Sequence, residues 1–126
     1  MEKAQIALIG LSYRTSPIVV RERLNCAVTA LPASFLARND RYASVRELVI
    51  LSTCNRVELY AAVEPHAARV QELLAALLSE TTGVDTAVFA GQLYFHSGRE
   101  AADHLLRVAT GLDSSGLGEP QTLGQV

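Results

Sequence analysis

The residues best suited to chemistry in this 126-residue chain lie in segment 51–60, which reads Leu-Ser-Thr-Cys-Asn-Arg-Val-Glu-Leu-Tyr. Cys54 stands between Thr53 and Asn55, and Arg56 follows two residues later. A thiolate is a strong nucleophile, so a cysteine that reaches a substrate can form a covalent intermediate. A nearby guanidinium can lower the pKa of a thiol or bind a carboxylate through two hydrogen bonds. The segment is therefore compatible with a reactive thiol beside a carboxylate-binding arginine.

Cys54 and Arg56 each have a purely structural interpretation as well. Cysteine is among the most buried residue types, so an inert, packed thiol explains Cys54 as well as a nucleophile does. Arg56 is equally compatible with an exposed arginine on a strand. Cys26 has no comparable neighbours, and we expect it to serve in packing.

His104 is the second candidate for chemistry. It shares one apolar face of a predicted helix with Ala101, Leu105 and Val108. A histidine in that position is commonly a hydrogen-bonded member of the core, and the functional alternative is a ring beside Cys54 that moves a proton or orients substrate. The remaining polar candidates are expected at surfaces or turns: His66, His96, Asp113 and Ser114.

Composition limits the class of protein. Apolar residues make up 49% of the chain, and no charge block interrupts it, which indicates one ordered domain. No apolar run approaches the roughly 18 residues of a membrane span, and the N-terminus lacks the pattern of a secretory signal. We therefore expect a cytoplasmic protein without membrane contact.

Charge and cysteine content exclude other classes. A net charge of −2 provides no general basic field for nucleic acid. Arg14, Arg21 and Arg23 lie close together near the first predicted helix, and we interpret them as a solvated helix face. The 2 cysteines make no disulfide framework, and the 3 histidines lack the close spacing of a zinc site, so no metal is expected.

Hydrophobic periodicity predicts the strands that position these side chains. Residues 5–13 are apolar on both faces, as in a central strand. Residues 47–51 and 56–63 predict two further strands with Cys54 in the turn between them, and the second alternates with the period of a half-buried strand. Residues 92–95 fit a short fourth strand.

Capping signals and apolar stripes predict the helices. Ser16 and Pro17 match an N-cap and first turn for a helix through residue 24, and 30–38 fits a second helical piece. Pro65 is expected to start a helix that Gly83 ends. Its stripe comprises Val70, Leu73, Leu74, Leu77 and Leu78. Residues 97–100 match a capping box, opening a helix to about residue 110.

The order strand, helix, strand, strand, helix, strand predicts a ferredoxin-like α+β sandwich (βαββαβ) with an additional C-terminal helix. Residues 111–126 then form a glycine-rich tail that also carries Asp113, Ser114, Glu119 and Gln121. No segment has the strand, glycine turn and helix of a dinucleotide-binding unit.

Four segments, in this order, resemble those of glutamyl-tRNA reductases. Segment 52–60 is similar to the family's catalytic-cysteine signature, and 10–17 is similar to an early segment that usually ends His-Lys-Thr-Ala-Pro. Segment 102–114 resembles the histidine helix and its exit, and 118–126 resembles the close of the catalytic domain. Tyr13 stands where a histidine is common, and Ser115-Gly116 replaces two bulky apolar residues.

The resemblance implies a reaction and a set of site residues. In this family a cysteine thiolate attacks the ester that joins glutamate to its tRNA, and NADPH reduces the thioester to glutamate-1-semialdehyde, a precursor of 5-aminolevulinate and tetrapyrroles. On that pattern Cys54 is the nucleophile and His104 is the activity-critical histidine. Thr53, Asn55 and Arg56 line the glutamate pocket. The residues matching the substrate-contacting tail are Ser114, Glu119, Pro120, Gln121 and Gln125.

The resemblance also implies partners. Members carry an NADPH-binding domain and a helical dimerisation domain beyond this region, so residues 1–126 are expected to be the N-terminal catalytic domain alone, able to acylate or hydrolyse but not to reduce. Glutamyl-tRNA, a homodimer of the full-length enzyme and glutamate-1-semialdehyde aminomutase are the implied partners. Two alternatives remain: a non-catalytic ferredoxin-like amino-acid-binding regulatory module, and a redox sensor that uses Cys54.

Overall fold

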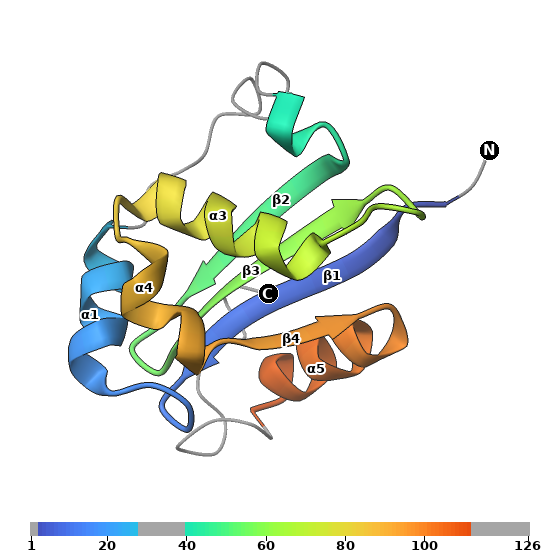
Figure 1. Ribbon diagram of the computed structural model, residues 1–126. Helices are drawn as coiled ribbons and strands as arrows, with labels where there is room; N and C mark the ends of the chain where they lie inside the picture. The colour runs from blue at the N-terminus through green and yellow to red at the C-terminus, as the bar shows by residue number, and fades with distance from the viewer. Residues whose placement is uncertain (1–2, 28–39, 112–126) are drawn as a thin grey trace.

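The computed structural model describes residues 3–27 and 40–111, and within them all side chains except those of residues 25–27 (Figure 1). Its centre is an antiparallel sheet in the order β2-β3-β1-β4. The strands are β1 (Gln5–Ser12), β2 (Val45–Ser52), β3 (Arg56–Val63) and β4 (Tyr94–Ser97). The prediction that the first strand is central is confirmed, since β1 pairs with β3 on one side and β4 on the other.

The register decides which side chains share a face. β1 and β3 align Ser12 with Arg56 and Gly10 with Glu58, while β4 places Tyr94 opposite Gly10. Because partners in antiparallel strands point to the same side, these residues lie together on one face of the sheet. The alternate residues of β3 point to the other face.

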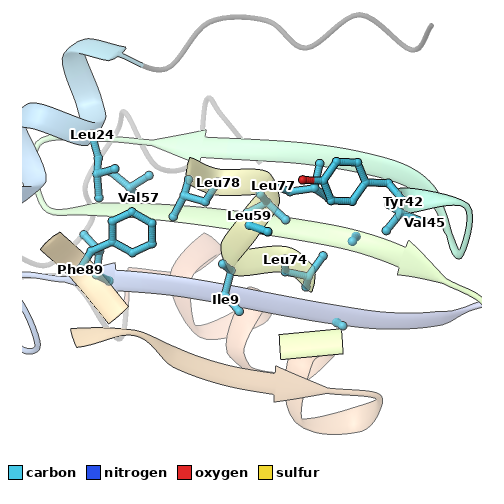
Figure 2. Packing of buried hydrophobic residues seen from close by; sticks show 14 of the residues in the cluster. Ile9, Leu24, Tyr42, Val45, Val57, Leu59, Leu74, Leu77, Leu78 and Phe89 are labelled. Carbon is cyan, nitrogen blue, oxygen red and sulfur yellow. The ribbon is translucent and has the colours of Figure 1, made fainter. Parts of the chain in front are cut away.

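That other face carries the hydrophobic core. Val57, Leu59, Ala61 and Val63 of β3 are buried there, as the alternation predicts. Helix α3 (Val70–Thr82) lies across them, with α1 (Ile18–Ala27) and α4 (Thr86–Phe89) at one end (Figure 1). Figure 2 shows the side chains that fill the space between helix and sheet, among them Ile9, Leu59, Leu74, Leu77 and Phe89.

Helix α5 (Arg99–Ala109) covers part of the opposite face and contacts β1 and β4. Ala101 and Val108 are its fully buried residues. The uncovered part of this face, over β2 and β3, is an apolar groove of about 290 Å³ bordered by Val49, Tyr60 and Leu105.

Several predicted boundaries were wrong. The helix expected at Pro65 begins at Val70, after Arg69 in the left-handed conformation (φ 54°). The expected capping box is absent, since Ser97 ends β4 and Gly98, with φ 58°, precedes α5 without a side-chain cap. Gly83 does end α3, with φ 73° and its N–H bonded to the Ser79 carbonyl, as predicted.

Other differences concern short elements. The first helix begins at Ile18, and the hydroxyl of Ser16 donates to Gln92 Oε1 at 2.6 Å. The strand predicted at 92–95 begins at Tyr94, because Ala90–Gln92 forms a 3₁₀ turn. Asp85 caps the unpredicted α4 by accepting from the Ala87 amide. The helix predicted at 30–38 and the tail after Gly111 lie outside the described residues.

Within the described ranges, no single helix combines the length and apolar character needed to cross a membrane. One pair, Val70–Thr82 with Thr86–Gln92, meets both criteria only when joined across a bend of 114°.

Replacing Leu77 tests the assignment of the core. Leu77 is 0% exposed beneath α3, so Leu77→Ala is expected to lower the free energy of unfolding by about 2–5 kcal/mol through lost burial and a residual cavity. Leu106→Ala is the matched control, because Leu106 is 63% exposed on α5. Urea unfolding monitored by circular dichroism measures both, and equal effects would contradict this core.

Candidate active site

Cys54 occupies the turn between β2 and β3, and its thiol is exposed and free. The Thr53 amide donates to the Arg56 carbonyl at 2.9 Å, which closes the turn. The Asn55 amide donates to Thr53 Oγ1 at 3.2 Å, and the Asn55 carbonyl accepts from the Tyr13 amide at 2.8 Å. The alternative of a buried thiol packed in the core is therefore wrong for Cys54.

Arg21 reaches the same turn from α1. Its Nη1 donates to the Cys54 carbonyl at 2.7 Å and its Nε donates to the Ser16 carbonyl at 3.3 Å. Arg14 and Arg23 are exposed, but Arg21 is only 9% exposed. The interpretation of these arginines as a solvated helix face was thus wrong for Arg21.

Arg56 is completely buried, so the alternative of an exposed strand arginine is also wrong. It points to the face of the sheet that α5 partly covers, where its Nη1 lies 3.5 Å from Glu58 Oε2. An arginine in this setting keeps its charge and is held by a counter-charge.

Glu58 is the centre of a buried polar cluster. Its carboxylate accepts hydrogen bonds from the hydroxyls of Tyr60, at 2.7 Å, and Tyr94, and it bonds to His104 Nε2. With Arg56, these groups come from β3, β4 and α5. Glu58 itself is 0% exposed, so every oxygen lone pair must find its donor within the protein.

Gly10 makes room for this cluster. A Cβ atom at position 10 would lie 2.8 Å from Glu58 Cγ and 3.0 Å from both Cε1 and the hydroxyl oxygen of Tyr94. These separations are too short for carbon, so any side chain at this position would push Glu58 and Tyr94 apart. The central strand β1 therefore has a glycine at the position where Glu58 of β3 and Tyr94 of β4 meet.

The cluster sets the ionisation of its members. Burial raises the pKa of Glu58, but the hydrogen bond and positive charge of His104, with the two tyrosine hydroxyls, outweigh it and hold the pKa below its ordinary range. Burial, followed by the Glu58 charge, raises the pKa of both Tyr60 and Tyr94. At neutral pH the carboxylate is therefore ionised and both phenols keep their protons.

His104 is held by Glu58 on the helix face that its spacing predicted. Its side chain is 11% exposed, and its ring lies 5.0 Å from that of His96 and 5.1 Å from that of Tyr94. His96, which was expected at the surface, has a side chain that is 32% exposed, and its ring stacks on that of His104. His104 contacts Glu58 of β3, the strand that follows the Cys54 turn. Arg56 lies between Cys54 and Glu58 in the sequence.

The structure brings the predicted residues Thr53, Cys54, Asn55 and Arg56 into one turn and the start of one strand. The predicted residues outside the described ranges are Ser114, Glu119, Pro120, Gln121 and Gln125. No three histidine, cysteine or acidic side chains are grouped to hold a metal ion in the part of the chain that the structure describes.

The sequence prediction missed several residues that shape this region: Gly10, Arg21, Glu58, Tyr60 and Tyr94. One signal was available, because Arg56, Glu58 and Tyr60 occupy alternate positions of a strand whose other positions are all apolar. That signal is ambiguous, because an antiparallel sheet can leave the polar face of such a strand in water, and only the structure shows that Arg56 and Glu58 are buried.

Replacing Glu58 tests the buried network. Glu58→Gln removes the negative charge beside Arg56 and His104, and we expect a loss of about 3 kcal/mol in unfolding free energy at pH 7. A group whose folded pKa lies below its unfolded value stabilises above the unfolded pKa and loses that effect as the pH falls through the folded value. The difference from wild type should therefore shrink below the ordinary carboxyl pKa of 4.5.

The control is Glu100→Gln, because that side chain is 80% exposed on α5 and its loss should leave stability nearly unchanged. Urea unfolding at a series of pH values between 3 and 7 gives the comparison. A loss for Glu58→Gln that is the same at every pH would show that charge is not what Glu58 contributes.

Comparisons with known proteins show the family to which the chain belongs. A family model described as "Glutamyl-tRNAGlu reductase, N-terminal domain" matches residues 9–126. A glutamyl-tRNA reductase of Salinispora arenicola (strain CNS-205) is 46% identical over 122 residues, covering 97% of this chain and 26% of that protein. One of Syntrophus aciditrophicus (strain SB) is 48% identical over 124 residues, covering 96% and 29%.

A solved structure shows the same likeness. Glutamyl-tRNA reductase from Methanopyrus kandleri matches with a TM-score of 0.61 and 26% identity, over 99% of this chain and 26% of that one. The chain thus spans about a quarter of the length of these relatives. Because the family model covers nearly all of it, the chain belongs to the family of glutamyl-tRNA reductase N-terminal domains.

Proposed function

We propose that this chain is the catalytic domain of a glutamyl-tRNA reductase, in which Cys54 captures the glutamyl group of glutamyl-tRNA as a thioester. The observation that carries the proposal is an exposed thiol in a turn whose main chain is fixed by Arg21 of α1 and by the amide of Tyr13, the residue after β1. The strand order β2-β3-β1-β4, with α1 and α3 on one face, supports assignment to the ferredoxin-like class with α5 added.

The acyl transfer is a nucleophilic substitution at an ester. The Cys54 sulfur attacks the ester carbonyl carbon, the bond from that carbon to the tRNA ribose oxygen breaks, and the oxygen leaves with its electron pair and takes up a proton. The products are free tRNA and a glutamyl thioester on Cys54. Covalent capture divides one difficult reduction into two easier steps, because a thioester accepts hydride more readily than an ester does.

Recognition of the glutamate side chain is assigned to Arg56. A carboxylate calls for a guanidinium, and the neutral amide of glutamine would leave that charge without a partner. Glu58, 3.5 Å away, holds Arg56 in place. Thr53 and Asn55 are proposed to line the glutamate pocket with Arg56. Ser114, Glu119, Pro120, Gln121 and Gln125 are proposed to close it.

His104 is proposed to act on the substrate from α5, where Glu58 holds its ring. Its Nε2 is bonded to Glu58, so Nδ1 is the ring nitrogen that can exchange a proton with a substrate or hold it in place. Glu58 then fixes the direction of the ring, as the acidic member of a catalytic triad does.

NADPH is the cofactor that the family implies, and it would supply the hydride that reduces the thioester. The described strands pair antiparallel throughout and include no strand, glycine turn and helix of a dinucleotide site, so these residues do not fit that group. We assign NADPH, the homodimer and contact with glutamate-1-semialdehyde aminomutase to the full-length cytoplasmic enzyme.

Labelled glutamyl-tRNA tests the proposal. Incubation with glutamyl-tRNA carrying labelled glutamate is expected to leave label on the wild-type chain, releasable by neutral hydroxylamine as a thioester is. Cys54→Ser should reduce the hydroxylamine-releasable label to background. Cys26→Ser is the matched control and should keep it, and added NADPH should yield no semialdehyde from this chain.

Two outcomes would overturn the proposal. The first is a folded wild-type chain that takes up no label. The second is reversible binding of free glutamate that survives Cys54→Ser without a covalent adduct, which would identify an amino-acid-binding module instead.

A further inference from the structure

Arg21, a side chain from outside the β2–β3 hairpin, holds the turn that carries Cys54. The guanidinium joins the main chain at two places: it donates to the Cys54 carbonyl at 2.7 Å and to the Ser16 carbonyl at 3.3 Å. These carbonyls belong to the β2–β3 turn and to the loop before α1. Arg21 therefore connects helix, loop and turn.

Burial makes this arrangement informative. Arginine is among the residues least often buried, because removing a guanidinium from water carries a large desolvation cost. Arg21 is nevertheless only 9% exposed, whereas Arg23, two residues further along the same helix, is exposed. Charged donors form stronger hydrogen bonds than neutral ones, so two carbonyl acceptors offset part of that cost.

The contact with Cys54 completes the fixation of the turn. Thr53 is tied to the Arg56 carbonyl, and Asn55 is tied to Tyr13 and to Thr53 Oγ1. Arg21 fixes the carbonyl of Cys54 itself, and hence the peptide plane between Cys54 and Asn55. Since the adjacent peptide planes set the direction of the Cα–Cβ bond, Arg21 helps to fix the direction in which the Cys54 side chain leaves the backbone.

We infer that Arg21 is a positioning residue for acyl transfer, acting through the main chain of Cys54 and not on the substrate. The inference rests on the proposed acyl-transfer function. A nucleophile must approach the carbonyl carbon along a narrow path, and a displacement of about 1 Å can cost on the order of 100-fold in rate. A loosened turn should therefore slow the chemical step and leave substrate binding largely intact.

The experiment compares Arg21→Met, Arg21→Lys and Arg23→Met with the wild-type chain. Single-turnover transfer of labelled glutamate to the protein, measured over a range of glutamyl-tRNA concentrations, separates the maximal rate from the half-saturating concentration. Thermal unfolding reports folding. Alkylation of Cys54 by iodoacetamide reports the intrinsic reactivity of the thiol, which does not require a fixed direction of attack.

Arg21→Met is expected to lower the maximal rate about 10- to 100-fold, with the half-saturating concentration and the alkylation rate within about 3-fold of wild type. Arg21→Lys retains one charged donor and should recover part of the loss. Ethylguanidine added to Arg21→Ala should also restore part of the rate. Arg23→Met should match wild type.

Three results would overturn the inference. A wild-type chain that takes up no label rejects acyl transfer itself, and with it the role of Arg21. A labelled wild type with Arg21→Met equally fast rejects Arg21 alone. A rate that falls only in proportion to the folded fraction, with no recovery in Arg21→Lys, would show that Arg21 serves folding and not the direction of the thiol.

Discussion

The buried carboxylate of Glu58 is the constraint on which the arrangement of this domain depends. An ionised group with no exposure must be surrounded by donors, and here they come from the same strand, from β4 and from α5. This requirement sets how α5 lies on the sheet and requires a glycine at position 10. Because the hydroxyl of Tyr94 and the ring of His104 both bond to this one carboxylate, the cluster favours one packing of α5 and β4.

The same strand connects that network to the reactive turn. Arg56 follows the turn and Glu58 follows Arg56, so the cluster that orders α5 also orders the arginine beside Cys54. In addition, Arg21 of α1 bonds to the Cys54 carbonyl, and the amide of Tyr13, the residue after β1, bonds to the Asn55 carbonyl. An exposed thiol thus sits on a main chain that is held at successive residues, which is what preorganised catalysis requires.

The sequence predicted those parts of the fold that local periodicity governs. The range of β3, the central place of β1 and the glycine end of α3 all follow from spacing or backbone conformation. The starts of α3 and α5 could not be predicted in this way. Each helix follows a residue with positive φ, Arg69 or Gly98, and neither residue matches a side-chain capping signal in the sequence. Cys54 and Arg56 could be identified by type and by motif. Arg21 and Tyr94 could not, because their roles depend on contacts between segments far apart in the chain.

Peptide mapping by mass spectrometry, after brief mixing of the chain with glutamyl-tRNA and acid quenching, locates the acyl group without relying on any variant. Capture by Cys54 predicts a mass increase of one glutamyl residue on the peptide that contains Cys54, lost on treatment with hydroxylamine. The same increase on the peptide that contains Cys26, or on no cysteine at all, would contradict the role assigned to the β2–β3 turn.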